Sequence, residues 1–257
     1  MIQGPPSLRR PLILGLWERW WWQMKNIWIS RNFQKYAKKH QIKYIEQLFK
    51  KIPLLIGKQF KFSEVGEYKK RELEPCLDLL ENAKMIHRIY HSAGNGLPLG
   101  AEINQKWLKV IFLDIALCQS VLGLDLATWF LNPKDQFINQ GHIAEAFIGQ
   151  ELLCYSMPQK HNSLYFWKRE KRASAAEIDF LFEHQGEVVP IEVKSGLGKK
   201  LKSMHLFLEC HPKSSYGILF SAHNHLEEEK VESIPLYAAI DLFHESQKES
   251  LKSLLEI

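Results

Sequence analysis

The 257-residue sequence lacks the features that mark several large classes of protein. Its four cysteines are scattered and form no C-x-x-C pair, which argues against a zinc ribbon or a secreted disulfide framework. No apolar stretch is long enough to span a bilayer. The apolar opening carries charges and has no small-residue cleavage site, unlike a signal peptide. We therefore expect a cytoplasmic protein without a membrane span.

Two motifs of common enzyme classes are also missing. No G-x-x-x-x-G-K-[ST] loop is present, because "LLIGKQF" holds Gly57 and Lys58 but neither the earlier glycine nor the following hydroxyl. The G-x-S-x-G nucleophile elbow of serine hydrolases is absent as well. We expect no ATP cofactor and no serine-hydrolase chemistry.

The composition is that of a soluble globular chain, with 46% hydrophobic and 25% charged residues. Its length allows one large domain or two ordinary ones. Lysine and arginine outnumber aspartate and glutamate by 34 to 29, which gives a net charge of +5. This mild excess is compatible with nucleic acid as a partner but does not by itself indicate it.

Residues 1–43 predict a tryptophan-rich, basic helical segment. Its aromatic face fits either an interfacial membrane helix or a helix docked on the rest of the protein. Residues 31–51 contain seven lysines and arginines and a single acidic residue, Glu46. This run is either a solvated helix face or a face that contacts phosphates.

Residues 44–130 predict a winged-helix domain. Leucines at helical spacing indicate a helix from about residue 69 to 83, and the strand-like "MIHRIY" and "KVIFLD" follow it. Lys69, Lys70 and Arg71 open that helix and are candidate DNA contacts. Because winged helices also serve as docking domains, a protein partner stays equally open.

Residues 131–257 predict an α/β domain, with the boundary between about residues 125 and 138 near the Asn132-Pro133 break. A helix over 140–156 is followed by strands "LYFWKR", "IDFLF" and "VVPIEVKS". A further helix and the strands "YGILFSA" and "IPLYAAI" complete the pattern, which predicts a sheet with helices on its faces.

The second and third of these strands carry the candidate chemistry. Strict alternation places Ile178, Phe180 and Phe182 on one face of the first strand and Asp179 on the other. Glu192 and Lys194 alternate in the same way with apolar residues on the second. One hairpin is therefore expected to present Asp179, Glu192 and Lys194 on the same side.

Such a trio suits phosphoryl chemistry. Two carboxylates are the hard oxygen ligands that Mg²⁺ or Mn²⁺ takes, and a lysine can stabilise developing negative charge. The preceding helix offers a further acid, Glu145. The alternative stays open that these residues are ordinary surface charges, because D-x(n)-E-x-K alone is degenerate.

The motifs G-x-x-x-E (Gly141 to Glu145), E-x-D-F (Glu177 to Phe180) and P-I-E-V-K-S (Pro190 to Ser195) together resemble the PD-(D/E)xK nuclease-like superfamily. More narrowly, the chain is similar to the family called "domain of unknown function 4143", whose members usually carry an AAA-type ATPase module in front. The resemblance implies a restriction-endonuclease-like core with a mixed sheet, without that ATPase module.

By this resemblance Asp179 and Glu192 are metal ligands, Lys194 is the catalytic lysine and Glu145 is an auxiliary acid. Ile178 stands where the superfamily name has proline. Basic residues flank the proposed site and fit a phosphate backbone; they are Lys168, Arg169, Lys199 and Lys200. Two functions follow as expectations: a Mg²⁺- or Mn²⁺-dependent DNA phosphodiesterase, or a non-catalytic DNA- or protein-binding module.

Overall fold

The computed structural model describes residues 37–123, 140–155, 164–169, 176–195, 201–222, 226–228 and 230–242. The tryptophan-rich opening up to residue 36, Lys199 and Lys200 lie outside these ranges. The chain divides into two compact units. The first comprises residues 1–54, 62–85 and 116–137, and the second comprises residues 55–61, 86–115 and 138–257.

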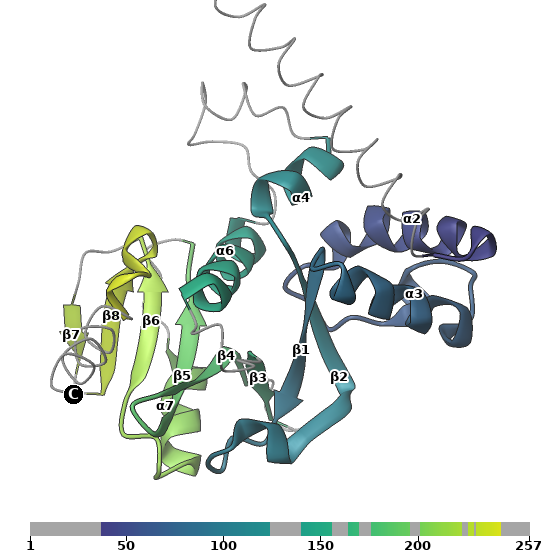
Figure 1. The fold of residues 1–257 in the computed structure, drawn as a ribbon. Helices are drawn as coiled ribbons and strands as arrows, with labels where there is room; N and C mark the ends of the chain where they lie inside the picture. The colour runs from purple at the N-terminus through teal and green to yellow at the C-terminus, as the bar shows by residue number, and fades with distance from the viewer. Residues whose placement is uncertain are drawn as a thin grey trace, which may run out of the picture. The chain divides into compact units, whose positions relative to one another are not determined.

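The first unit is helical. Helices α2 (Ile42–Lys51) and α3 (Lys70–Asn82) contact each other and bury their apolar faces, including Leu48 and Leu77. Helix α3 begins where sequence spacing predicts it. Its first turn is capped by Glu72, which accepts a hydrogen bond from the Lys69 backbone N–H at 3.0 Å. Helix α4 (Ile115–Val121) follows later in the chain (Figure 1).

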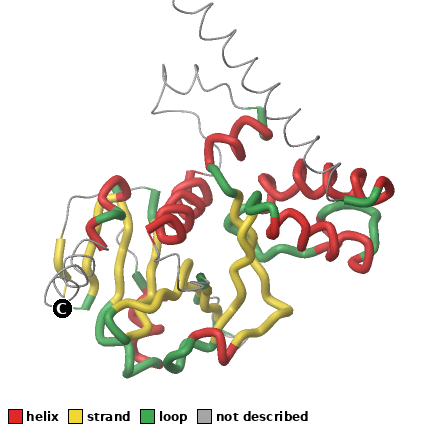
Figure 2. The backbone as a smooth tube through the Cα atoms, viewed as in Figure 1, coloured by secondary structure: helices red, strands yellow, loops and turns green. Residues whose placement is uncertain are grey.

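The second unit holds an eight-stranded mixed sheet in the order β2-β1-β3-β4-β5-β6-β8-β7. Its strands are labelled in Figure 1 and drawn in yellow in Figure 2. The strands are β1 (Ile86–Ser92), β2 (Ile103–Phe112), β3 (Tyr165–Lys168), β4 (Glu177–His184), β5 (Glu187–Val193), β6 (Gly217–Ser221), β7 (Leu226–Glu228) and β8 (Val231–Pro235). Helices α6 (Gln140–Tyr155) and α7 (Lys202–Cys210) contact the sheet. Short 3₁₀ turns lie at Lys39–Gln41, Ile52–Leu55, Phe62–Glu64, Leu99–Glu102 and Leu236–Ala238.

The two strands expected as a wing belong to this sheet. β1 pairs antiparallel with β2 and, on its other edge, parallel with β3 through Tyr90 and Tyr165. Strand β2 begins six residues before the predicted "KVIFLD" strand. This hairpin is therefore continuous with the sheet that carries the motif residues, whereas α2 and α3 belong to the first unit.

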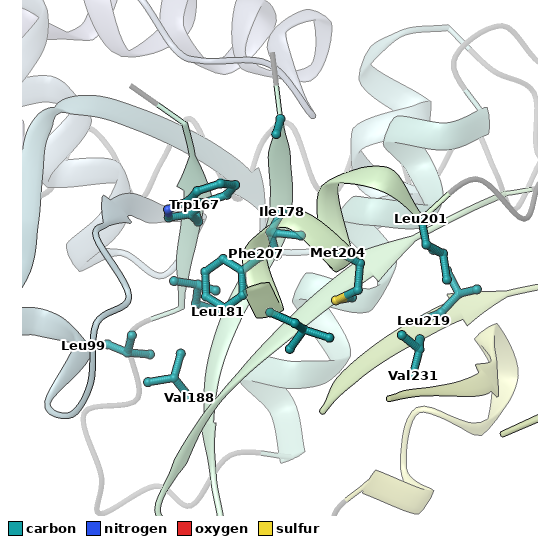
Figure 3. Packing of buried hydrophobic residues seen from close by; sticks show 12 residues of the cluster. Leu99, Trp167, Ile178, Leu181, Val188, Leu201, Met204, Phe207, Leu219 and Val231 are labelled. Carbon is teal, nitrogen blue, oxygen red and sulfur yellow. The ribbon is translucent and has the colours of Figure 1, made fainter. Parts of the chain in front are cut away.

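One hydrophobic cluster lies between α7 and the sheet. Phe207 of α7 packs edge-on against Trp167 with ring centroids 5.2 Å apart, and Met204, Ile178 and Leu181 belong to the same cluster (Figure 3). Gly217 keeps room for this helix, because a Cβ there would clash with Met204 and lie 3.2 Å from Pro190. Pro190 and Gly217 therefore face α7.

Strand β4 departs from strict alternation. Ile178 and Leu181 both belong to the α7 cluster, whereas Phe180 faces α6, where a Cβ on Gly149 would lie 2.8 Å from its ring. The β3–β4 register shifts by one residue over the same stretch. The prediction that Ile178 and Phe180 share a face is wrong, because a bulge inserts one residue and reverses the side-chain direction.

Candidate functional site

The β4–β5 hairpin brings Asp179, Glu192 and Lys194 to one end. Phe180 pairs with Ile191, so Asp179 and Glu192 come next on the two strands. Past this pair the regular ladder stops, and the Val193 backbone N–H donates to Asp179 Oδ2 at 2.8 Å. The aspartate side chain thus takes the place of a backbone acceptor between the strands. This fixes its carboxylate next to Val193.

Glu192 and Lys194 form a close pair. Lys194 Nζ lies 2.5 Å from Glu192 Oε1, and the Lys194 backbone N–H donates to Phe220 of β6 at 2.8 Å. The Glu192 side chain is 6% exposed, and its Oε2 has no hydrogen-bond partner among the described residues. A buried carboxylate oxygen without a partner is costly, so this atom is available to a ligand.

Lys109 of β2 is a site residue that the sequence analysis missed. Its ammonium lies 2.9 Å from Glu145 Oε1 and 2.6 Å from Glu177 Oε1, and its side chain is 3% exposed. It also lies 5.1 Å from the centre of the Phe166 ring. Burial alone would lower the pKa of Lys109, but the carboxylates of Glu145, Asp179 and Glu177 more than reverse this and raise it.

Glu145 projects from α6 toward Lys109. Burial would raise the pKa of Glu145, but the Lys109 ammonium, with help from His142, holds it below its ordinary range. In return the Glu145 carboxylate raises the pKa of His142, whose Nδ1 lies 3.8 Å from Glu145 Oε2. Glu145 is therefore a charged, internally paired acid.

Asp179 lacks such compensation. Burial raises its pKa to about 7, and the fields of Glu145 and Glu192 add to this; Lys109 and the Val193 N–H oppose it. Asp179 forms no ion pair within 4.0 Å in the described part of the chain, unlike its neighbours Glu177 and Glu192. The fold thus holds Asp179 in surroundings that disfavour its charged form.

The motif residues do not all project to one face. Glu145, Lys109 and Glu177 form one group on the α6 side of the sheet. Alternation along β5 puts Glu192 on the side of Pro190, which faces α7. Asp179 is hydrogen-bonded to the Val193 backbone N–H, and the charges of both Glu145 and Glu192 raise its pKa.

This arrangement limits which residues could bind a divalent metal ion. Among the described residues, no three His, Cys, Asp or Glu side chains are grouped so that they could hold an ion. Asp179 and Glu192 nevertheless suit the chemistry of Mg²⁺ or Mn²⁺, because Glu192 has a buried, unpartnered oxygen and the charged form of Asp179, disfavoured by burial, would be stabilised by a cation. Mg²⁺ commonly takes only one or two carboxylates, with water and substrate phosphate as further ligands.

The basic residues predicted as DNA contacts lie in different settings. Lys69 and Arg71 are exposed at the start of α3, and Lys70 pairs with Glu74 at 3.2 Å. In the second unit, Lys168 Nζ lies 3.2 Å from Glu177 Oε2. Arg169 is half-buried, and its backbone N–H donates to Ala176 at 2.9 Å.

A sequence signal for Lys109 did exist. Lys109 lies between Leu108 and the apolar run Val110 to Phe112, in the C-terminal half of β2, which is buried. A charged residue enclosed in this way requires a partner. The partners could not be identified, because Glu145 and Glu177 are far away in sequence.

With this geometry in place, comparison with known proteins supports the suspected family. Residues 140–239 match the family model described as Domain of unknown function (DUF4143). Residues 22–128 match a second model, Domain of unknown function (DUF8612). The DUF4143 region contains α6, the β4–β5 hairpin and α7, and with them every motif residue. Lys109 falls in the DUF8612 region.

Other comparisons add little. No curated protein matches the chain. Among solved structures, protein VC1899 from Vibrio cholerae is similar at 13% identity and a TM-score of 0.27, which is too low to carry an argument. The match covers 83% of this chain and 57% of that one. In the described residues, no helix is long and apolar enough to cross a membrane.

Proposed function

We propose that the chain is a metal-dependent phosphodiesterase that acts on DNA, with its site at the end of the β4–β5 hairpin. The observation that carries this proposal is the pair of carboxylates beside Val193. Glu192 has a buried oxygen without a partner, and Asp179 has a pKa raised to about 7. Acids held in such an unfavourable state are typical of functional sites.

The chain's own residues have distinct roles in this proposal. Asp179 and Glu192 would hold Mg²⁺ or Mn²⁺, which when bound supplies Lewis-acid stabilisation of a phosphodiester and activation of water. Lys194, ion-paired to Glu192 at 2.5 Å and about one third exposed, can turn its ammonium toward the negative charge of a phosphate. Glu145 acts indirectly, through its field on Asp179.

The test is cleavage of plasmid and single-stranded DNA with Mg²⁺ or Mn²⁺. Asp179→Asn keeps a side-chain oxygen for the Val193 N–H but removes the charge, so we expect activity to fall at least a hundredfold. Lys194→Ala should also lose activity. Glu209→Gln, an exposed substitution on α7, is the matched control and should cleave like wild type. Equal cleavage by wild type and Asp179→Asn would refute the proposal.

A second candidate is a non-catalytic module that binds DNA or protein. Lys109 favours it, since this ammonium neutralises Glu145 and Glu177 without any metal ion. The exposed Lys69 and Arg71 at the start of α3 would then supply phosphate contacts.

Binding measurements separate the two candidates. A binding module should bind DNA in a salt-dependent way, keep this affinity in Asp179→Asn, and lose it on Lys69→Glu with Arg71→Glu. Salt-dependent binding that survives in the charge-reversed variant would exclude the α3 contact. Metal-dependent cleavage lost in Asp179→Asn would favour the enzyme.

A further inference from the structure

His142, in the first turn of α6, is an ionisable side chain that the proposed function leaves without a role. Its Nδ1 lies 3.8 Å from Glu145 Oε2, and this carboxylate raises the pKa of His142 above its ordinary 6.5. Partial burial and the positive charges of Lys58 and Lys109 oppose the rise without cancelling it. The fold therefore favours the positively charged imidazolium near neutral pH.

The His142 ring is packed on one side and open on the other. Gly57, in the segment 55–61 of the same unit, lies against the ring near Nδ1, where a Cβ would clash with it. Gly57 also has a φ of +71°, in the left-handed region that favours glycine. In the described part of the chain Nε2 has no hydrogen-bond partner, and the side chain is 37% exposed. The Nε2–H group is therefore available to a ligand.

The start of α6 lies beside the end of the β4–β5 hairpin. A Cβ on Gly141 would be 3.9 Å from Ser195 Oγ, so these two residues are neighbours in space. His142 follows Gly141 in the chain, and Lys194 precedes Ser195. His142 and Lys194 are therefore each one residue away from the point where the helix meets the hairpin.

These two cations have similar surroundings. Lys194 is 36% exposed and pairs with the buried carboxylate of Glu192, and the half-exposed His142 pairs with the buried carboxylate of Glu145. Each positive group thus has a carboxylate on one side and solvent on another. Two accessible cations at neighbouring positions suit a ligand with a row of negative groups. A nucleic-acid backbone is such a ligand, because it carries one negative phosphate per nucleotide.

We propose that the His142 imidazolium donates a hydrogen bond from Nε2 to a backbone phosphate of bound DNA, next to the phosphate that Lys194 contacts. The inference rests on the proposed function, because it names a further substrate contact of the same site. Glu145 gains a second role, since it keeps His142 charged. A charge-assisted hydrogen bond to phosphate weakens when the donor loses its charge, so the contribution of His142 to DNA affinity falls as the pH rises.

The experiment measures binding of a labelled DNA duplex to the full chain by fluorescence anisotropy, with a chelator present, at pH 6 and pH 8.5 and at several salt concentrations. At pH 6 the slope of log Kd against log salt should be smaller by about one in His142→Gln than in wild type, because one phosphate contact is lost. At pH 8.5 the two slopes should agree. His205→Gln, an exposed substitution on α7, is the matched control and should follow wild type at both pH values.

Each result supports or overturns the proposal. Equal slopes for wild type and His142→Gln at pH 6, or no DNA binding by wild type at that pH, would overturn it. A slope difference that is as large at pH 8.5 as at pH 6 would also overturn it, since the contact would not need the imidazolium. A lower thermal midpoint of His142→Gln with unchanged slopes would mean that His142 only supports packing against Gly57. Absence of DNA cleavage would count only against the proposed function, because binding is measured without a metal ion.

Discussion

Replacement of Asp179 by asparagine should stabilise the protein at neutral and alkaline pH. Folding moves this carboxyl into surroundings that raise its pKa from an ordinary 3.8 to about 7. Between these two values the folded state binds more protons at this residue than the unfolded state does. Stability therefore falls as the pH rises through this window and stays low above pH 7.

The size of the effect follows from the shift. A rise from 3.8 to about 7 is roughly 3 pH units, and each unit corresponds to about 1.36 kcal/mol. The charged Asp179 thus lowers the free energy of unfolding by about 4 kcal/mol above pH 7. Asparagine keeps an oxygen for the Val193 N–H, and so avoids the charge without losing the hydrogen bond.

The assay is urea unfolding at pH 4.5, 6 and 8 with a chelator present. We expect Asp179→Asn to exceed wild type by up to about 4 kcal/mol at pH 8 and by only about 1 kcal/mol at pH 4.5. Glu209→Gln should follow wild type at every pH, since Glu209 is exposed.

An equal difference between wild type and Asp179→Asn at all three pH values, or a variant that is less stable at pH 8, would contradict a raised pKa of Asp179 in the folded state. A more stable but inactive variant would also show that lost cleavage is not lost folding. It would identify Asp179 as a residue kept for function at the expense of stability.

Three other changes test the packing and charges of the second unit. Gly149→Val should destabilise the protein by about 2 kcal/mol in urea unfolding, because its Cβ would lie 2.8 Å from the buried Phe180 ring; unchanged stability would contradict that contact. Phe207→Ala should lower the unfolding free energy by about 3–5 kcal/mol, and a loss below 1 kcal/mol would mean that α7 is not anchored there. Lys109→Met should cost about 3–5 kcal/mol without metal, since it leaves Glu145 buried and unpaired, whereas Lys168→Met should cost far less; equal losses would refute the distinction.

Much of the secondary structure was accessible from sequence because it depends on local periodicity. Leucines at helical spacing indicate α3, and the apolar runs indicate β3 to β6. The bulge in β4 was not accessible, and it puts Ile178 and Phe180 on opposite faces of the strand, where alternation predicts one shared face. Such a bulge depends on how a strand pairs with its neighbours, which local alternation does not encode.

The residues of the candidate site were likewise accessible from sequence only in part. Sequence alone indicated Asp179, Glu192, Lys194 and Glu145, because motif spacing and strand alternation are properties of short segments. Only the tertiary structure brought in Lys109, which is 36 residues before Glu145 and is bound to it through space. The net charge of a buried site depends on all the side chains that the fold packs together. Because those residues are far apart in sequence, the sequence alone does not predict that charge.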